Sequence, residues 1–414
     1  MASAFVTIEG KSKKYYLTVV ILAILSVIGF ICFGLSYIFG HQLFGSSNVV
    51  PWGMPIVLAI FLIGLSAGLH ILAFLIYIMN QGQYSKVIKV AVFLAAVLIF
   101  GAMVAIAIDL GRPEKFWRLF MLVYLNNMSS MFAINSIFYS CYLLSAVIYL
   151  IALLNNMKKF SFIMGMVAFG WAMLTHGGTG AIFGFIGARE TWFSALSPFE
   201  FIMAAFASSI ALLTLVLLLL FKSTGRKISW SLIGSLVGLT KAFLIGLILL
   251  MVVGELTHLY PAHRDAVLYM LAGPYSWLFW GFQIFLGMVI PLFILYYPKT
   301  KNSPKGIIAA SILVVIGIFV KRYYLVIPGG AYPMHLFPGH IEGVYGDIGQ
   351  FYLMPAELGW SIGILALMAL VFILGLKYLD LLPPKDVDGL GGLSTSSSSE
   401  GWSENPATAT QQSS

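Results

Sequence analysis

The chain has 414 residues, of which 60% are hydrophobic and only 9% are charged. Soluble domains contain about 25% charged residues, so this composition excludes a soluble protein and indicates a polytopic membrane protein. The net charge of +8 does not indicate nucleic-acid binding, because the cations lie in short segments between apolar runs.

Apolar runs of about 18 or more residues indicate membrane-spanning helices. Ten such runs occur along the chain: Tyr16–Phe39, Trp52–Met79, Val87–Ile108, Met131–Leu154, Phe160–Phe185, Pro198–Phe221, Ser229–Thr257, Tyr275–Tyr297, Gly306–Ile327 and Pro355–Tyr378. No small-residue cleavage site follows the first run, so we interpret it as a retained helix and not as a signal peptide. The expected fold class is an all-α polytopic membrane protein with ten transmembrane helices.

The distribution of lysine and arginine predicts the orientation of these helices. Most of the 23 cations lie in segments on the same side of the membrane as the amino terminus. The positive-inside rule therefore places both termini in the cytoplasm. The longer connections then lie outside, at residues 109–128, 186–197, 258–274 and 328–354. A large partner would dock most naturally on that outer side.

A weak internal repeat predicts the domain organisation. The second to fifth helices and the sixth to ninth helices have the same order and orientation. The third and seventh helices both end in a carboxylate, Asp109 and Glu255, followed by proline and basic residues. We therefore expect a membrane domain over residues 1–382, with a first four-helix bundle at 52–185, a second at 198–327, and flanking helices. Residues 383–414, rich in Ser, Thr, Gly and Gln, are predicted to be a disordered cytoplasmic tail.

The stretch Asp109–Trp117, with the sequence DLGRPEKFW, stands out at the end of the third helix. An ionisable group at the rim of the hydrocarbon layer is costly, so it usually has a task or a partner. The alternative is that this stretch only ends the helix at the membrane interface: Gly111 and Pro113 stop the helix, and the cations contact lipid headgroups.

Titratable residues recur at a similar outer depth in five helices. Besides Asp109 they are His176, Glu255, His258, Arg322 and Glu357, and Lys241 lies about four turns below Glu255 on nearly the same face. Buried charges of this kind mark proton, ion or substrate routes. We therefore predict a proton route through Lys241, Glu255, His258, Arg322 and Glu357. The alternative is a set of structural ion pairs, such as Lys241 with Glu255 or Arg322 with Glu357.

The cysteines argue against a cluster bound by this chain. Only Cys32 and Cys141 occur, both inside apolar runs, whereas an iron–sulfur cluster needs about four ligands. A b-type haem would need two histidines at equal depth that face each other, and only His176 with His258 comes near that condition. The cysteine count therefore argues against an iron–sulfur cluster in the chain, and a b-type cytochrome stays open as an alternative.

Several short motifs occur in an order that resembles a known family. They are Pro51-Trp-Gly53, the small-residue patch Gly64–Gly68, DLGRPEKFW, GWAMLTH ending at His176, ETWFSALSPFEF at Glu190–Phe201, GPYSW at Gly273–Trp277, Lys321–Arg322, and MPAELGW at Met354–Trp360. Together they resemble the NrfD/PsrC family of integral membrane subunits. The likeness covers residues 16–382 and is greatest for ten-helix members of the HybB, DsrP and QrcD type and for ActC and ActF of alternative complex III.

The resemblance implies a quinone- or quinol-interacting membrane anchor of a multisubunit respiratory oxidoreductase, which is not catalytic alone. Its substrate would be menaquinone or ubiquinone, and the chain itself would hold no haem, iron–sulfur cluster or metal. An iron–sulfur ferredoxin-like subunit would exchange electrons with it on the outer side, and the family also includes complexes with multihaem cytochrome c and molybdopterin-type subunits. The expected location is the cytoplasmic (inner) membrane of a bacterium or archaeon, with lipid but no nucleic acid as a partner. Proton translocation is a further expectation for the alternative complex III branch.

The resemblance also implies site residues. Asp109 and His176 match polar positions of the family, and Arg112 belongs to the same DLGRP string. Ser66 stands where some members have a histidine, and Trp52 could form a wall for the ring. A quinone site needs an apolar pocket, hydrogen-bonding groups at the two carbonyls and a titratable group nearby. The competing interpretations are a secondary transporter, which would explain buried charges and a repeat, and a b-type cytochrome.

Overall fold

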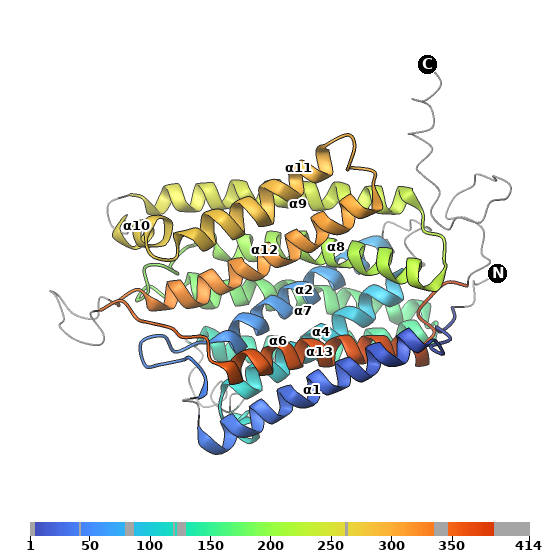
Figure 1. Cartoon of the computed structure of the whole chain (residues 1–414), viewed down its shortest axis with the longest axis horizontal. Coiled ribbons are helices and arrows are strands. Elements are labelled where there is room, and N and C mark those ends of the chain that lie inside the picture. Colours follow the sequence, from blue (N-terminus) through green and yellow to red (C-terminus); the bar gives the residue numbers. More distant parts are fainter. Residues whose placement is uncertain are drawn as a thin grey trace.

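A computed structural model describes residues 5–40, 43–78, 87–118, 121, 130–260, 264–334 and 347–384. Within these residues, ten helices are long and apolar enough to cross a membrane, which confirms the expected fold class. The helices lie side by side along the long axis of the molecule (Figure 1). The predicted tail falls outside the described residues from residue 385 onward, so its disorder stays a prediction.

The first bundle consists of α2 (Met54–Ile78), α4 (Ile88–Asp109), α6 (Met131–Leu154) and α7 (Lys158–Gly184). Its helices pack in a ring, because α2 contacts both α4 and α7, and α6 contacts the same two helices. The hydroxyl of Ser130 caps α6 by accepting a hydrogen bond from the Ala133 amide, which satisfies one of the free N–H groups at the helix start.

The second bundle consists of α8 (Ser197–Thr224), α9 (Trp230–His258), α12 (Pro304–Ala331), and a broken helix made of η4 (Leu278–Val289) and α11 (Ile290–Tyr296). It joins the first bundle through α2, which contacts α8 and α12, and through α7, which contacts α8. Because α2 is covered on all sides, it is buried along its whole membrane span and is apolar all round.

The flanking helices α1 (Lys13–Phe39) and α13 (Pro355–Tyr378) pack against each other. Gly29 and Gly363 meet backbone to backbone, because a side chain on either would collide with the other. In Figure 1 this pair forms one edge of the molecule, and α9 and α11 form the opposite edge. Val6 pairs with Leu382, so the start of α1 and the end of α13 lie at the same end of the bundle.

The eighth membrane span departs from the regular α-helix that its sequence predicts. Residues 278–289 form a π-helix, and the amide of Ile290 bonds to the carbonyl of Phe285, five residues earlier. Pro291 follows directly, and its ring lacks an N–H and would clash with the carbonyl four residues before it. A wider turn is one way in which a helix accommodates such a break.

The predicted outer loop at 328–354 begins later than expected, because α12 continues through Pro328 to Ala331. The last carbonyls of a helix have no partner within the helix. Here the preceding loop supplies donors: Arg189 bonds to the Gly330 carbonyl at 2.7 Å, and Thr191 bonds to the Gly329 carbonyl at 2.7 Å. The predicted loop at 258–274 likewise contains a short helix, α10 (Arg264–Ala272).

Candidate functional site

A small apolar cavity of about 20 Å³ lies in the half of the first bundle that contains the start of α2 and the end of α7. It is lined by Trp52, Ile56, Ala59, Ile60, Ile63, Ile106, Phe132, Tyr139, Thr179, Ile182 and Phe183. All four helices of the bundle, or the residues just before them, contribute to this wall. The Trp52 ring stacks on Trp192 with ring centroids 5.4 Å apart and meets Phe183 edge-on at 5.4 Å. The predicted Trp52 therefore lies at the cavity, among aromatic neighbours.

Two buried hydroxyl groups provide the polar part of this cavity. Thr179 donates its hydroxyl hydrogen to the Thr175 carbonyl at 2.6 Å. Its oxygen lies 3.0 Å from the Tyr139 hydroxyl, so Tyr139 is the donor of that bond. The Tyr139 oxygen keeps acceptor capacity, because a phenol donates one hydrogen bond and can accept others. The cavity thus combines an apolar wall with one hydroxyl pair.

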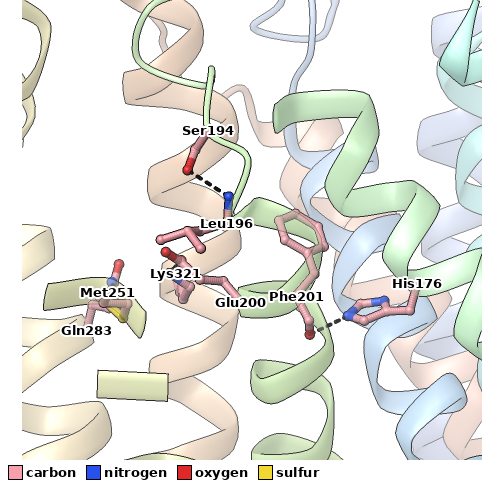
Figure 2. Close-up of polar contacts among 8 residues, drawn as sticks. All are labelled: His176, Ser194, Leu196, Glu200, Phe201, Met251, Gln283 and Lys321. Carbon is pink, nitrogen blue, oxygen red and sulfur yellow. Dashed lines mark hydrogen bonds and ion pairs between the residues drawn. The ribbon is translucent and has the colours of Figure 1, made fainter. Parts of the chain in front are cut away.

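His176 lies one turn before Thr179 on α7 and is completely buried. Its Nε2 lies 2.7 Å from the Phe201 carbonyl (Figure 2). A carbonyl only accepts, so Nε2 carries the hydrogen, and Nδ1 has no hydrogen-bond partner among the described residues. The imidazole ring faces Gly64 of α2, where a Cβ would collide with it. His176 supports the wall of the cavity, whereas Thr179 lines it.

Asp109, at the end of α4, and Glu357, in the first turn of α13, lie at the same end of the molecule as the start of α2. Asp109 is half-buried one turn beyond Ile106, and its carboxyl is within electrostatic range of Glu357. Glu357 is completely buried and accepts hydrogen bonds from the amides of Gly45, at 3.1 Å, and Met54. It therefore places a carboxylate at the amino terminus of α2, where the helix dipole favours negative charge.

The structure separates Arg112 and Ser66 from the apolar cavity. Arg112 is exposed and lines an open hollow of about 680 Å³ between the DLGRP loop and the end of α1. Ser66 lies deeper in the bundle, where it donates to the Ala95 carbonyl at 2.7 Å and contacts the Tyr142 hydroxyl at 2.8 Å. The same tyrosine hydroxyl bonds to His70 Nδ1 at 2.6 Å. Of the five predicted quinone residues, Trp52, Asp109 and His176 therefore lie at or near the end of the first bundle that contains the apolar cavity.

A second cavity of about 90 Å³ lies in the second bundle, at the end that contains the start of α8 and the end of α9. Three of the predicted proton-route residues line it, namely Glu255, His258 and Arg322. Two residues that sequence reasoning did not select join them, Glu200 of α8 and Lys321 of α12. Their side chains form an ion pair with Nζ and Oε2 2.9 Å apart (Figure 2). This cavity is polar and charged, unlike the first.

Arg322 is the most unusual group of this cavity, since it is a guanidinium whose side chain is completely buried. Its guanidinium carbon lies 3.8 Å from the centroid of the Phe201 ring. Within the described part of the chain, none of its three guanidinium nitrogens has a hydrogen-bond partner. The alternative of an Arg322–Glu357 ion pair is therefore wrong, because Glu357 binds backbone amides at the other bundle.

Lys241 also lies apart from this cavity. Its ammonium group sits 4.4 Å from the centroid of the Tyr296 ring, which α11 contributes near the opposite end of the bundle. The alternative of a Lys241–Glu255 ion pair is therefore not realised either. His176 and His258, the two histidines nearest to a haem ligand pair, lie on α7 and α9, and α8 contacts both helices. His176 Nε2 lies 2.7 Å from the Phe201 carbonyl. No group of three or more His, Cys, Asp or Glu side chains in the described ranges could hold a metal ion.

The loop between α7 and α8 contacts the walls of both cavities. Arg189 binds the Gly330 carbonyl and packs against Trp192, with its guanidinium carbon 4.8 Å from the ring centroid. Burial lowers the pKa of this guanidinium below its ordinary value. Trp192 donates to the Leu325 carbonyl at 2.7 Å, stacks on Trp52 and lines the polar cavity. Helical spacing could have selected Thr179, three residues after His176, but nothing in the sequence pairs Glu200 with Lys321.

Comparison with known proteins matches residues 42–333 to the family model described as polysulphide reductase, NrfD. An Hdr-like menaquinol oxidoreductase integral membrane subunit of Archaeoglobus fulgidus is 34% identical over 395 residues, covering 94% of this chain and 99% of that protein. A subunit of the selenate reductase of Mesobacillus selenatarsenatis is 30% identical, covering 87% and 92%. The integral membrane subunit of a menaquinone reductase of Nitratidesulfovibrio vulgaris is 27% identical, covering 82% and 85%.

Proposed function

Because the chain belongs to the NrfD family of polysulphide reductase membrane subunits, we propose that it exchanges electrons between menaquinone and a partner subunit of an oxidoreductase complex. The relatives' names support menaquinone over ubiquinone, since two of them are named for menaquinol or menaquinone. They also favour an oxidoreductase subunit over the secondary transporter that buried charges alone would allow.

The apolar cavity of the first bundle carries this proposal. Ligand sites for flat apolar molecules combine an aromatic and aliphatic wall with a few placed polar groups. The cavity has such a wall, the Tyr139–Thr179 hydroxyl pair, and Asp109 one turn away from Ile106. Its volume of about 20 Å³ is smaller than a quinone ring. Entry of the ring therefore requires side chains such as Trp52 or Phe132 to rotate, a change that commonly accompanies binding.

The chemistry of the quinone assigns roles to the surrounding groups. Reduction takes two electrons and two protons, so each carbonyl oxygen needs a hydrogen-bonding group and a path for a proton. The Tyr139 hydroxyl can face one carbonyl. Asp109, at the outer end, is placed to exchange a proton with the outer aqueous phase. His176 Nδ1 is the available acceptor on the imidazole, and the Thr175 carbonyl, one residue before His176, holds the Thr179 hydroxyl in place.

Electrons have to reach this site from another polypeptide on the outer side. We propose an iron–sulfur ferredoxin-like subunit as that partner, with multihaem cytochrome c or molybdopterin-type subunits further away in the complex. The support is the position of the cavity at the outer end of the bundle. The hollow beside Arg112 lies at this end too and adds a basic surface for docking.

Substitution of the two titratable residues tests the proposal. We expect Asp109→Asn and His176→Ala each to lower quinone turnover by roughly 100- to 10,000-fold, the usual effect of losing a positioned proton-transfer group. Turnover is measured on the purified complex, after the presence of every partner protein has been checked. The matched control is Glu114→Gln, an exposed carboxylate of the adjoining loop. Near-normal turnover in both variants would place the quinone site elsewhere.

The orientation of the chain is part of the same proposal, because the cavity must open toward the outer partner. We expect cysteines introduced at Glu114 and at Lys301, both exposed, to react with a membrane-impermeant reagent from opposite sides. Only the Glu114→Cys variant should react in intact cells, in a background without Cys32 and Cys141. Labelling of Lys301→Cys in intact cells would reverse the proposed topology.

The proton route that we propose contains fewer residues than the sequence predicts. Lys241 and Glu357 lie away from the polar cavity, so we retain only Glu255, His258 and Arg322 as one proposed proton-handling group at the outer end of the second bundle.

A further inference from the structure

The Arg322 side chain is 1% exposed inside the second bundle. Arginine side chains stay protonated in proteins, so this position holds a buried cation. Its contact with the Phe201 ring offsets part of the loss of hydration. That contact supplies no hydrogen-bond acceptor, and the three guanidinium nitrogens find none among the described residues. A buried charge is stable only if its donors are also satisfied. Acceptors must therefore come from something other than the described side chains and carbonyls.

The polar cavity supplies the space for such acceptors. Arg322 lines it, and its volume of about 90 Å³ exceeds several times the 10–15 Å³ that one water molecule needs. A second buried polar atom on the wall, the Gln283 side-chain oxygen, also has no hydrogen-bond partner in the described ranges. Two unrelated side chains with unsatisfied polar atoms thus border one cavity.

The charges around the cavity decide what fills it. Helix α12 contributes two cations, Lys321 and Arg322. Three segments contribute a carboxylate each: Glu200 from α8, Glu255 from α9 and Glu190 from the loop before α8. His258 lies at the end of α9. Lys321 neutralises Glu200 at 2.9 Å. A small anion would enter a space already faced by carboxylates from three segments. Water can accept from the guanidinium and donate to a carboxylate at once, so it fits both sides.

Glu200 and Glu255 differ in the hydrogen-bond partners of their carboxylate oxygens. Oε2 of Glu200 binds Lys321, and its Oε1 faces the backbone of α9, where a Cβ on Gly254 would lie 3.1 Å away. The absence of a side chain at Gly254 leaves room for that oxygen. No described residue donates a hydrogen bond to Glu255. Among these two carboxylates, Glu255 is the one available to water.

We propose that the cavity holds a cluster of water molecules that hydrogen-bonds to Arg322 and connects it to Glu255, and that Glu255 binds and releases a proton through this water. Thr191 and Ser194 of the proposed outer loop and Ser197 at the start of α8 form part of the wall, so the cluster is close to the outer aqueous phase. Arg322 holds the water in place, and the Glu200–Lys321 pair sets the charge beside it. The proposal is independent of the quinone site, because none of its groups lines the apolar cavity.

The water is tested by hydroxyl-radical footprinting of the intact complex, which labels side chains next to bound water. The probe is Met270, which lines the cavity and is 8% exposed, and the reference is Met368, which is 4% exposed between α13 and α4. We expect Met270 to be labelled several-fold more than Met368, and Arg322→Met to remove most of that excess. Replacing a buried charge by an apolar side chain of similar length is often tolerated, so this variant should still fold.

Two results would overturn the proposed cluster. One is equal labelling of the two methionines in the unmodified protein, which would show a dry cavity. The other is unchanged Met270 labelling in Arg322→Met, which would show that bulk solvent, and not water held by Arg322, reaches the probe. Arg322→Lys supplies a further check, because it keeps the charge and should preserve most of the labelling even if Arg322→Met assembles poorly.

Proton binding by Glu255 is tested by infrared difference spectroscopy of the same complex after a change in pH. We expect a band of a protonated carboxyl group that disappears in Glu255→Gln and persists in Glu114→Gln. Persistence of the full band in Glu255→Gln would overturn the assignment of the proton to Glu255. Quinone turnover is recorded in parallel, and retained turnover in Glu255→Gln would separate this site from the first-bundle site.

Discussion

The cavities of the two bundles lie at the same end of the molecule but differ in what lines them. In the first bundle, aromatic and aliphatic side chains surround one hydroxyl pair, Tyr139 and Thr179. In the second bundle, an ion pair, a carboxylate and a buried guanidinium surround the cavity. The helix arrangement is similar, so the choice of side chains at the outer turns gives each bundle its chemistry.

The difference bears on the two tasks that we propose for the two bundles. A lipid-soluble ring gains free energy from an apolar wall and would lose it beside fixed charges. Protons and water, by contrast, need titratable groups and hydrogen-bonding partners in a closed space. The two environments are only one residue apart on α8, since Glu200 binds Lys321 while the Phe201 carbonyl binds His176 (Figure 2).

The largest effect on stability is expected from breaking the ion pair of the second bundle. Lys321→Met leaves Glu200 partly buried without its partner, which should lower the free energy of unfolding by about 3 kcal/mol, the low end for a buried pair. The side chains keep 13% and 18% exposure, which moderates the cost. The measurement is unfolding of the purified chain in detergent. The double variant with Glu200→Gln should recover most of the loss, and an unrecovered loss would show that packing and not charge was removed.

A smaller effect, confined to the first bundle, is expected from filling the apolar cavity. Ala59→Phe places a ring in the space that we assign to quinone and should weaken quinone binding by roughly 10- to 100-fold, as pocket contacts of this size do. Val267→Phe makes a matched change at the wall of the polar cavity and should leave quinone binding intact. Binding is measured by titration of the complex with a menaquinone analogue. Equal weakening in both variants would contradict the division of tasks.

The smallest expected effect is the change in the free energy of unfolding of Gln283→Met. Whether the variant is more or less stable distinguishes a dry cavity from a hydrated one. In a dry cavity, Gln283→Met removes an unsatisfied buried oxygen and should stabilise the protein by about 1 kcal/mol or more. In a hydrated cavity, the same change removes a hydrogen bond to water and should destabilise it by about 0.5 kcal/mol. We expect the second result, and detergent unfolding of the variant distinguishes the two.

Sequence patterns alone were sufficient for the membrane-spanning helices. Apolar runs of this length have few alternatives, because every backbone polar group in a bilayer must be paired within the helix. The runs at Val87–Ile108 and Pro355–Tyr378 match α4 and α13 to within one residue at either end. The hydroxyls of Ser12, Ser130 and Ser229 cap the starts of α1, α6 and α9, which is a local interaction. The DLGRP string could likewise be connected to a family before any fold was known.

Only the tertiary structure decided which polar residues meet. Depth along a helix can be counted from the sequence, but the direction around the helix axis depends on the neighbours that each helix finds. Glu357 and Arg322 lie at similar predicted depth, yet Glu357 turns to the first turn of α2 and Arg322 turns to Phe201. Lys241 shares a face with Glu255 and still meets Tyr296, because four helical turns separate the two charges.

The break in the eighth span has the same origin. Pro291 is visible in the sequence, but a proline kink, a helix end and a π-helix are all compatible with it. Close packing against α12 at Gly287 and Gly317 holds the helix together on both sides of the proline. The sequence by itself determined the number, length and polarity of the helices, since these depend on local composition. Their contacts, and therefore the two cavities, depend on side chains far apart in the chain, which only folding brings together.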